Sequence, residues 1–172
     1  LLQDPRTIVF KKGSTSPLPR ADLLKILPVS RVGKTVTRDG AVFLLKNGHL
    51  GKIIFYDNDS QKRDALSEYD IGKKMGLADI GPKVFNCYTI TTTMERPISK
   101  NMLLNRRSGK EAIMIELQNL ADGAKRLVTL YEWLTEGKPY PVKQVEALEK
   151  KMKNQKIMHG DLHANNILLR IL

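Results

Sequence analysis

The sequence contains a single cysteine, Cys87, among 172 residues, so no disulfide can form within the chain. This composition suits a reducing compartment, although secreted bacterial proteins that act inside host cells are also poor in cysteine. The longest apolar runs, such as residues 53–56, are far shorter than the roughly 20 residues of a membrane-spanning helix. We therefore expect no membrane span and an intracellular site of action.

Aromatic residues are also few, at 6% of the chain, whereas positive charge is abundant. Lysine and arginine number 29 against 18 acidic residues, which gives a net charge of +11. Such a surface favours an anionic partner, for example a nucleotide, a nucleic acid, an acidic membrane or an acidic protein. A nucleic-acid interface usually combines basic residues with exposed aromatic ones, and here most aromatics lie in apolar runs. We therefore do not expect nucleic acid as the main partner.

The start of the chain carries few signals of regular structure. It begins with Leu1 rather than methionine and shows no signal-peptide pattern, so we expect it to be part of a longer chain. Residues 13–19 contain glycine, serine and two prolines, which favour turns. We predict a loop-like lead-in over residues 1–24.

The pattern after residue 25 predicts a β-rich half followed by a helical half. Its strongest local signal is Asn47-Gly48 between two apolar runs, which is typical of a two-residue hairpin. In chain order we expect a strand region over 26–37, strands over 41–45 and 50–56, a helix over 61–75, a strand over 84–93, a polar turn over 101–110, a strand over 111–117, and helices over 126–134 and 142–152.

This order predicts an α+β fold with two lobes. The first lobe, over residues 25–117, is β-rich and contains one helix. A connecting hinge follows over 118–123, and an α-rich lobe over 124–172 is either minimal or cut short. No internal repeat is visible.

Residues 159–166 read His-Gly-Asp-Leu-His-Ala-Asn-Asn and stand directly before an apolar run. Phosphoryl transfer needs a carboxylate that orients the acceptor hydroxyl and an oxygen ligand that holds Mg²⁺ against the phosphates. Asp161 suits the first role and Asn166, five residues later, suits the second. The motif resembles the catalytic loop of the protein-kinase-like superfamily. In that resemblance His159 braces the loop, and His163 replaces a phosphate-contacting lysine, which leaves its role open.

Two other interpretations of this motif remain. A polar turn between a helix and a strand could contain these residues by chance. Two histidines four residues apart could also be zinc ligands, but Gly160 is a poor helix residue and no glutamate lies between the histidines to act as a general base.

The resemblance to kinases also implies an ion pair between a lysine on the third strand of the first lobe and a glutamate on the helix that follows. Lys52 lies on the strand after the hairpin, and Glu68 follows sixteen residues later on the predicted helix. In kinases this lysine neutralises the α- and β-phosphates of ATP, and the glutamate fixes the rotamer of the lysine. Both residues could instead be ordinary surface charges.

The same resemblance assigns an adenine pocket. Ile115 would be the gatekeeper on the strand that enters the hinge. The backbone carbonyl of Glu116 and the amide of Gln118 would face the adenine edge, and Leu168 would form the floor of the pocket. Each of these residues could equally be a core or linker residue.

The predicted phosphate-covering loop departs from the kinase pattern. Gly33, Gly40 and Val42 match a first glycine and a final Gly-x-Val, but they are two residues too far apart and the middle glycine is missing. Gly33 also begins a Gly-Lys-Thr that resembles the end of a P-loop. Pro28 stands where the first P-loop glycine belongs, and the following residues predict a strand rather than a helix, so we set the P-loop aside.

The resemblance, over about residues 29–169, implies an ATP- and Mg²⁺-dependent phosphotransferase, most simply a protein serine/threonine kinase. No second metal-binding aspartate follows Asn166, so a pseudokinase-like binding module is an alternative. A small-molecule kinase of the aminoglycoside or choline type is another. The compactness of the chain resembles that of the minimal kinases of bacterial secretion systems, including HopBF and OspG-like effectors. This resemblance implies secretion into the host cytoplasm and a host protein as substrate. Small viral kinases are a further possibility.

Overall fold

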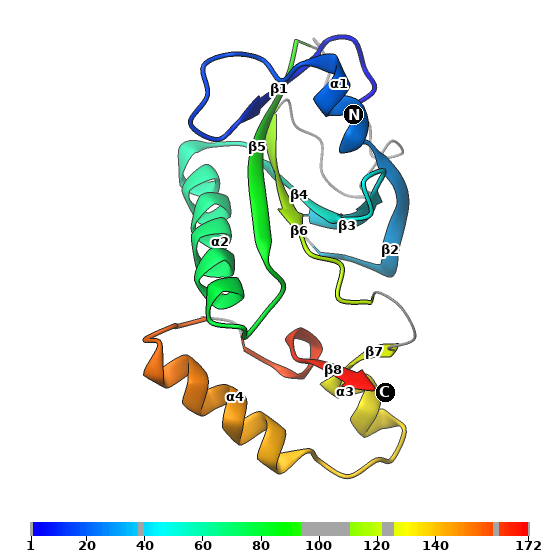
Figure 1. Cartoon of the computed structure of the whole chain (residues 1–172), viewed down its shortest axis with the longest axis vertical. Coiled ribbons are helices and arrows are strands. Elements are labelled where there is room, and N and C mark those ends of the chain that lie inside the picture. The colour runs from blue at the N-terminus through cyan, green and yellow to red at the C-terminus, as the bar shows by residue number, and fades with distance from the viewer. Residues whose placement is uncertain (1, 38–39, 94–110, 122–125, 160–161, 172) are drawn as a thin grey trace. The chain divides into compact units, whose positions relative to one another are not determined.

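The computed structural model describes residues 2–37, 40–93, 111–121, 126–159 and 162–171 (Figure 1). Within them the fold is α+β, as the sequence predicted, with a mostly antiparallel sheet and four helices, one more than the three predicted. The chain divides into two compact units, one formed by Leu1–Asp70 and Val84–Gln118, the other by Ile71–Lys83 and Asn119–Leu172. The division after Gln118 falls at the start of the predicted hinge, whereas residues 71–83, predicted for the first lobe, group with the second unit.

The first unit is built around a six-stranded sheet in the order β1-β5-β6-β4-β3-β2, in which every neighbouring pair is antiparallel. Its two central strands, β4 and β6, are apolar over most of their length because side chains on both faces are buried. The strands are β1 (Thr7–Lys11), β2 (Pro28–Thr37), β3 (Gly40–Leu45), β4 (Leu50–Tyr56), β5 (Val84–Thr92) and β6 (Glu111–Leu117).

The predicted hairpin at Asn47-Gly48 is confirmed by the antiparallel pairing of β3 with β4, but the prediction of a two-residue loop was wrong, because Leu45 bonds to His49 and three residues, 46–48, lie between them. Gly48 has a φ of +86°, a conformation that costs glycine little. The Oδ1 atom of Asn47 accepts a hydrogen bond of 3.0 Å from the amide of His49, and the amide of Leu45 donates to the carbonyl of His49 at 2.8 Å. These contacts fix the register in which β4 enters the sheet.

The prediction of a loop-like lead-in over residues 1–24 was wrong. Residues 7–11 form β1, which pairs along its whole length with β5, and Arg20–Lys25 form helix α1. Val9 is 3% exposed and joins the core, and Leu18 and Leu23 pack against it. The strand was missed because five alternating residues give a weak signal beside a segment rich in serine and proline.

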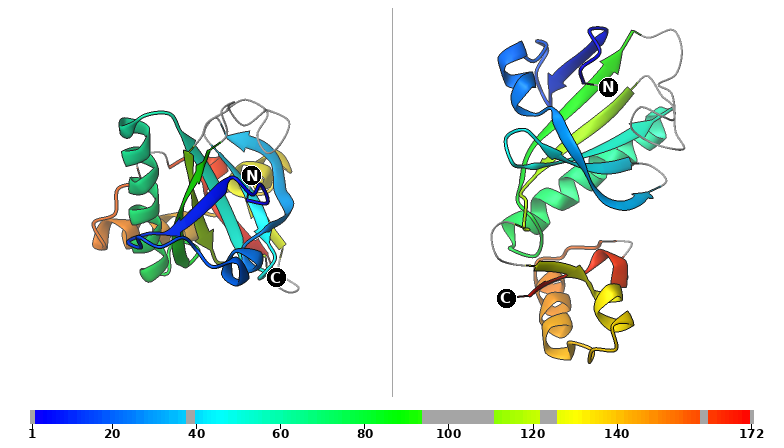
Figure 2. Two further views of the ribbon diagram at one scale, coloured as in Figure 1. Left: turned by 90° about the horizontal axis from the view of Figure 1, so that it is seen from above. Right: turned by 90° about the vertical axis from the view of Figure 1, so that its right-hand side faces the viewer.

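Two apolar clusters cover the two faces of this sheet. Figure 2 shows helix α2 beside one face of the sheet and the N-terminal segment with α1 at the other. Helix α2 (Asp59–Leu77) confirms the predicted helix over 61–75 and contributes Ala65 and Tyr69 to one cluster. The N-terminal segment and α1 lie against the other. Because side chains alternate along a strand, successive residues of β4 and β6 belong to opposite clusters. We call these the α2 face and the α1 face.

The described part of the second unit contains the C-terminal end of α2, a short two-stranded sheet and two further helices. The helix predicted over 126–134 begins only at Leu130, because residues 126–129 form a strand that pairs with the end of the chain. Thr129 and Glu132 form a capping box that starts the helix, a signal that the prediction overlooked. The elements are β7 (Arg126–Thr129), α3 (Leu130–Thr135), α4 (Val142–Asn154), the 3-10 turn η1 (Ala164–Asn166) and β8 (Leu168–Ile171).

Helix α4, which the sequence predicted over 142–152, ends in a Schellman motif. The amide of Ile157 donates to the carbonyl of Met152 at 2.9 Å, and the amide of Lys156 donates to Lys153 at 3.1 Å. Lys156 takes the left-handed conformation, with a φ of 54°. Ile157 is buried, so it anchors the chain at the end of α4, two residues before His159. No helix among the described residues is long and apolar enough to cross a bilayer.

Candidate functional site

Lys52 and Glu68 form an ion pair in the first unit, as the resemblance to kinases implied. Lys52 lies on β4, the third strand of the predicted first lobe, because β1 belongs to the segment predicted as a lead-in. Glu68 lies on α2 and receives a hydrogen bond from the ammonium group of the lysine. The two side chains are 27% and 46% exposed, so the pair remains open to solvent. The catalytic role of either residue stays a prediction.

The ion pair stands in a row of residues that crosses the sheet on its α2 face. Lys52 is directly opposite Val42 on β3 and opposite Ile115 on β6, and Ile115 is opposite Cys87 on β5. Burial raises the pKa of the Cys87 thiol to about 11, so this thiol is neutral at pH 7. The structure thus brings three predicted site residues, Val42, Lys52 and Ile115, side by side on one surface.

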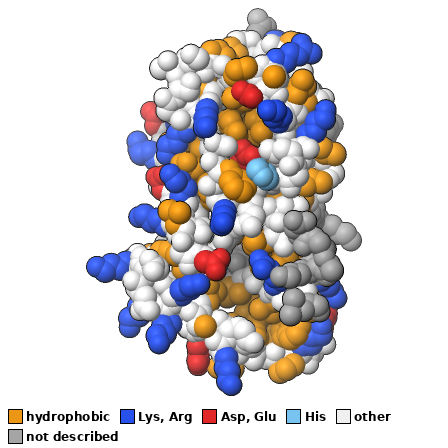
Figure 3. Space-filling view, in the orientation of Figure 1, with side chains coloured by type: hydrophobic (Ala, Val, Ile, Leu, Met, Phe, Trp, Pro, Cys, Tyr) orange, Lys and Arg blue, Asp and Glu red, His pale blue; other side chains and the backbone are white. Residues whose placement is uncertain are grey.

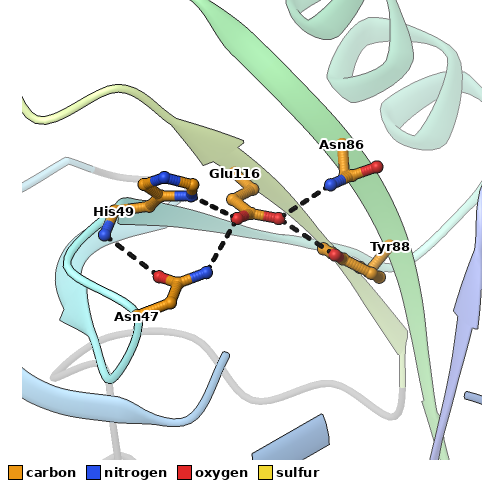
Figure 4. Close-up of polar contacts among 5 residues, drawn as sticks. All are labelled: Asn47, His49, Asn86, Tyr88 and Glu116. Carbon is orange, nitrogen blue, oxygen red and sulfur yellow. Dashed lines mark hydrogen bonds and ion pairs between the residues drawn. The ribbon is translucent and has the colours of Figure 1, made fainter. Parts of the chain in front are cut away.

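The α1 face of the same two strands holds a different polar group (Figure 4). Glu116 is 3% exposed, and four side chains surround its carboxylate. Its Oε2 atom accepts a hydrogen bond of 2.9 Å from Asn47 and lies 2.5 Å from Nδ1 of His49. Its Oε1 atom accepts bonds of 2.9 Å each from Asn86 and Tyr88.

Burial by itself would raise the pKa of Glu116, but the hydrogen bonds lower it further than burial raises it. The pKa therefore lies below the ordinary value of a glutamate, with His49 the largest favourable contribution. The ring of His49 stacks on Phe85, with centroids 4.3 Å apart, which holds the imidazole against the carboxylate. This group ties the β3–β4 hairpin to β5 and β6.

The sequence prediction for Glu116 concerned its backbone carbonyl and missed the side-chain cluster. The signal was present, because a carboxylate between two apolar residues of a central strand must find hydrogen-bond donors if it is buried. The strand continues to Leu117, which pairs with Leu50 and Val84. Gln118 is the first residue beyond the ladder and is half-buried.

The residues of the predicted phosphate loop lie on β2 and β3. Val32 is opposite Val42 and Thr37 is opposite Gly40, with a register shift between these two pairs. Gly33 falls within the shifted stretch of β2. Residues 38–39 lie outside the described residues, so the strands of the predicted loop are present but its tip is not described.

The predicted catalytic loop lies in the second unit. Asp161 and the preceding residue are outside the described residues, whereas His159 is half-buried before them. Ala164–Asn166 form η1, and His163 is its N-cap, whose Nδ1 accepts a bond of 3.2 Å from the amide of Asn165. Nδ2 of Asn166 lies 3.2 Å from Nε2 of His163.

The remaining site residue, Leu168, begins β8 opposite Thr129 and is 51% exposed. The described site residues therefore divide between the two units. The first unit holds Gly33, Gly40, Val42, Lys52, Glu68, Ile115, Glu116 and Gln118, and the second holds His159, Asn166 and Leu168. Within the described ranges, no three histidine, cysteine or acidic side chains gather as metal ligands would. Lysine and arginine side chains are spread over the face shown in Figure 3 rather than gathered in one patch.

Comparison of the chain with protein-family models, with curated proteins and with solved structures finds no match.

Proposed function

We propose that this protein is an ATP-dependent phosphotransferase of the protein-kinase-like type that phosphorylates serine or threonine on a protein. The observation that carries the proposal is the ion pair between Lys52 of β4 and Glu68 of α2. Sixteen residues separate the two, and the resemblance to kinases specified both partners and both elements. A chance surface pair would not be expected to join these two positions.

The neighbours of Lys52 support the same assignment. Apolar Val42 and Ile115 flank the lysine on the α2 face, so a cation stands beside an apolar surface. A nucleotide needs both, because its phosphates are anionic and its adenine ring is flat and apolar on both sides. In this proposal Lys52 binds the phosphates and half-buried Val42 contacts the base, whereas Ile115, which is 3% exposed, stays in the core behind that surface.

The second unit supplies the groups that act on the acceptor. Asp161 would orient the hydroxyl of the substrate and take its proton, and His159 would support the loop. Asn166 would bind Mg²⁺ through its side-chain amide oxygen, because this ion prefers oxygen ligands. When bound, Mg²⁺ would neutralise charge on the phosphates.

The decisive experiment measures transfer of label from γ-labelled ATP in the presence of Mg²⁺. Separate reactions contain casein, an aminoglycoside such as kanamycin, or no acceptor. We expect label on casein or on the chain itself. Label that appears only on the aminoglycoside would favour the small-molecule alternative. No label on any acceptor, together with no measurable ATP binding, would reject the proposal.

Lys52→Met and Asp161→Ala test the assigned roles. We expect each to reduce transfer by roughly 100-fold or more, as loss of one preorganised charged group does in other enzymes. Lys11→Met is the matched control, because Lys11 is an exposed lysine on another strand of the same sheet. Equal losses for Lys11→Met and Lys52→Met would show that only the general positive charge matters.

A further inference from the structure

Lys12 extends the row of residues that crosses the sheet on the α2 face. It lies one residue beyond the end of β1, and its amide donates a hydrogen bond of 2.8 Å to the carbonyl of Cys87 on β5. Cys87 is opposite Ile115 on β6, and Ile115 is opposite Lys52 on β4. This part of the row therefore has a lysine at each end and two buried residues, Cys87 and Ile115, between them.

Both lysines contact the same turn of helix α2. The ammonium group of Lys52 donates a hydrogen bond to Glu68, and that of Lys12 lies 3.4 Å from Oδ1 of Asp70. The Lys12 ammonium also lies over the ring of Tyr69, 4.4 Å from the ring centroid, which makes a cation–π contact. Three consecutive residues of the helix are thus in contact with the two lysines.

The order of these three residues around the helix determines what the contacts do. Successive residues of an α-helix are about 100° apart around its axis. Tyr69 is buried in the cluster between α2 and the sheet, so Glu68 and Asp70 lie on opposite sides of it. Lys52 therefore holds one side of the helix from β4, and Lys12 holds the other side from the end of β1.

We propose that Lys12 is a positioning residue, which fixes the rotation of α2 about its own axis and so keeps Glu68 directed toward Lys52. The helix turns as one body, so a rotation in either direction moves Glu68 relative to Lys52 and Asp70 relative to Lys12 together. The contacts of Lys12 therefore oppose the same motion that would break the ion pair of Lys52. The consequence for phosphate transfer rests on the proposed function, whereas the fixed rotation of α2 does not.

Lys12 is too far from Lys52 to act on it directly. Three strand spacings of about 4.8 Å separate the two ends of the row, so the two backbones lie roughly 14 Å apart. Substitutions at that distance normally have independent effects. An effect of Lys12 that depends on the ion pair of Lys52 would therefore identify α2 as the connection between them.

Three substitutions isolate the role of Lys12. Lys12→Met removes the cation but keeps an unbranched apolar side chain. Lys12→Arg keeps a cation that can pair with Asp70 and stack on Tyr69. Lys11→Met is the matched control, because Lys11 is an exposed lysine opposite Tyr88, a residue of the α1 face.

The first measurement follows the ion pair without any nucleotide. NMR records the nuclear Overhauser contacts between the side-chain protons of Lys52 and Glu68 in the unaltered chain and in each variant. We expect these contacts to weaken by about 2-fold or more in Lys12→Met, because an exposed ion pair and an exposed cation–π contact each favour one arrangement by up to about 5-fold. They should stay unchanged in Lys12→Arg and Lys11→Met. Undiminished contacts in Lys12→Met would overturn the inference.

The second measurement is the transfer of label from γ-labelled ATP to casein in single and double variants. We expect Lys12→Met to reduce transfer by roughly 2-fold to 10-fold and Lys12→Arg to retain most of it. In a chain that already carries Glu68→Ala, Lys12→Met should cause no further loss, because the ion pair through which it acts is absent. A further loss of the same size would show that Lys12 acts independently of that pair, and it would reject the positioning role.

The outcomes distinguish this inference from the function on which its consequence rests. If the contacts between Lys52 and Glu68 weaken in Lys12→Met but the unaltered chain transfers no label, the proposed function fails and the fixed rotation of α2 stands. If the unaltered chain transfers label and Lys12→Met changes neither the contacts nor the transfer, the positioning role is rejected and the proposed function stands.

Discussion

Two glutamates of the first unit, Glu116 and Glu68, lie on opposite faces of the same sheet and have opposite surroundings. Glu116 is 3% exposed and has four side-chain partners on the α1 face. The side chain of Glu68 is 46% exposed, and its one ion-pair partner is Lys52 on the α2 face. Burial demands that every lone pair of a carboxylate be satisfied, whereas solvent can replace a missing partner at the surface.

The difference separates a carboxylate that stabilises the fold from an ion pair that contributes little to its stability. The carboxylate of Glu116 is enclosed, so it can join strands but cannot meet a ligand. The pair of Lys52 with Glu68 contributes little to folding because water competes for both groups. The proposed function would give this pair a role besides folding, because Lys52 would bind the phosphates.

The largest effect expected from this comparison is the loss of stability in Glu116→Ala. Removal of the carboxylate leaves four polar side chains without their acceptor in a buried place, so we expect a cost of about 3–5 kcal/mol. Glu68→Ala should cost at most about 1 kcal/mol, because the pair is exposed. Urea unfolding followed by circular dichroism measures both. Equal costs for the two variants would remove the distinction between the faces.

A smaller loss is expected for Gly51→Ala, which tests how closely the α1 face is packed. Gly51 is opposite Glu116 in the ladder, and a Cβ atom at this position would lie 2.8 Å from a methyl carbon of Leu45 and 3.0 Å from the sulfur of Met114. Overpacking of this kind costs about 1–3 kcal/mol. Thermal unfolding provides the measurement, and an unchanged melting temperature would show that the α1 face is loosely packed.

Much of this arrangement could be predicted from the sequence, because its local signals are strong. Asn47-Gly48 specified the hairpin, and the hairpin placed Lys52 on a strand that precedes a long amphipathic helix. The pair with Glu68 was predicted only when the resemblance to kinases was applied to that order. The α+β class followed from the same elements.

The remaining features depend on contacts between distant residues, which periodicity does not reveal. β1 is only five residues long and exists because β5 offers it an edge. β7 was predicted as helix because its four residues precede a true helix, and only its pairing with β8 makes it a strand. The partners of Glu116 come from β5 and from the turn between β3 and β4, so the sequence could predict that this carboxylate needs donors but not which residues supply them.

A third prediction concerns acid, and its effect should be smaller than that of deleting Glu116. In the unfolded chain this carboxyl titrates near its ordinary value of 4.5, and in the folded chain its pKa is lower. The unfolded state therefore takes up the proton first. The stabilisation is complete well above pH 4.5 and is lost as the pH falls through the folded pKa.

Unfolding free energies measured from pH 7 down to pH 3 test this sign. We expect the unaltered chain to lose more stability over this range than Glu116→Gln, whose amide does not titrate there. Glu68→Gln is the matched control on the α2 face and should retain the acid dependence of the unaltered chain. The reverse result, with the acid dependence lost in Glu68→Gln, would place the titrating group on the other face.

The smallest effect expected is that of salt on the ion pair itself. Salt screens exposed charges, and the Debye length falls from about 10 Å at 0.1 M to about 3 Å at 1 M. The stability difference between the unaltered chain and Lys52→Met, at most about 1 kcal/mol, should therefore shrink in 1 M NaCl. The difference between the unaltered chain and Glu116→Gln should change less, because the partners of that carboxylate exclude the ions. A salt-independent contribution from Lys52 would mean that the lysine stabilises the fold through packing of its methylene groups on the α2 face. That result would weaken the case that the ammonium group of Lys52 is available to a phosphate.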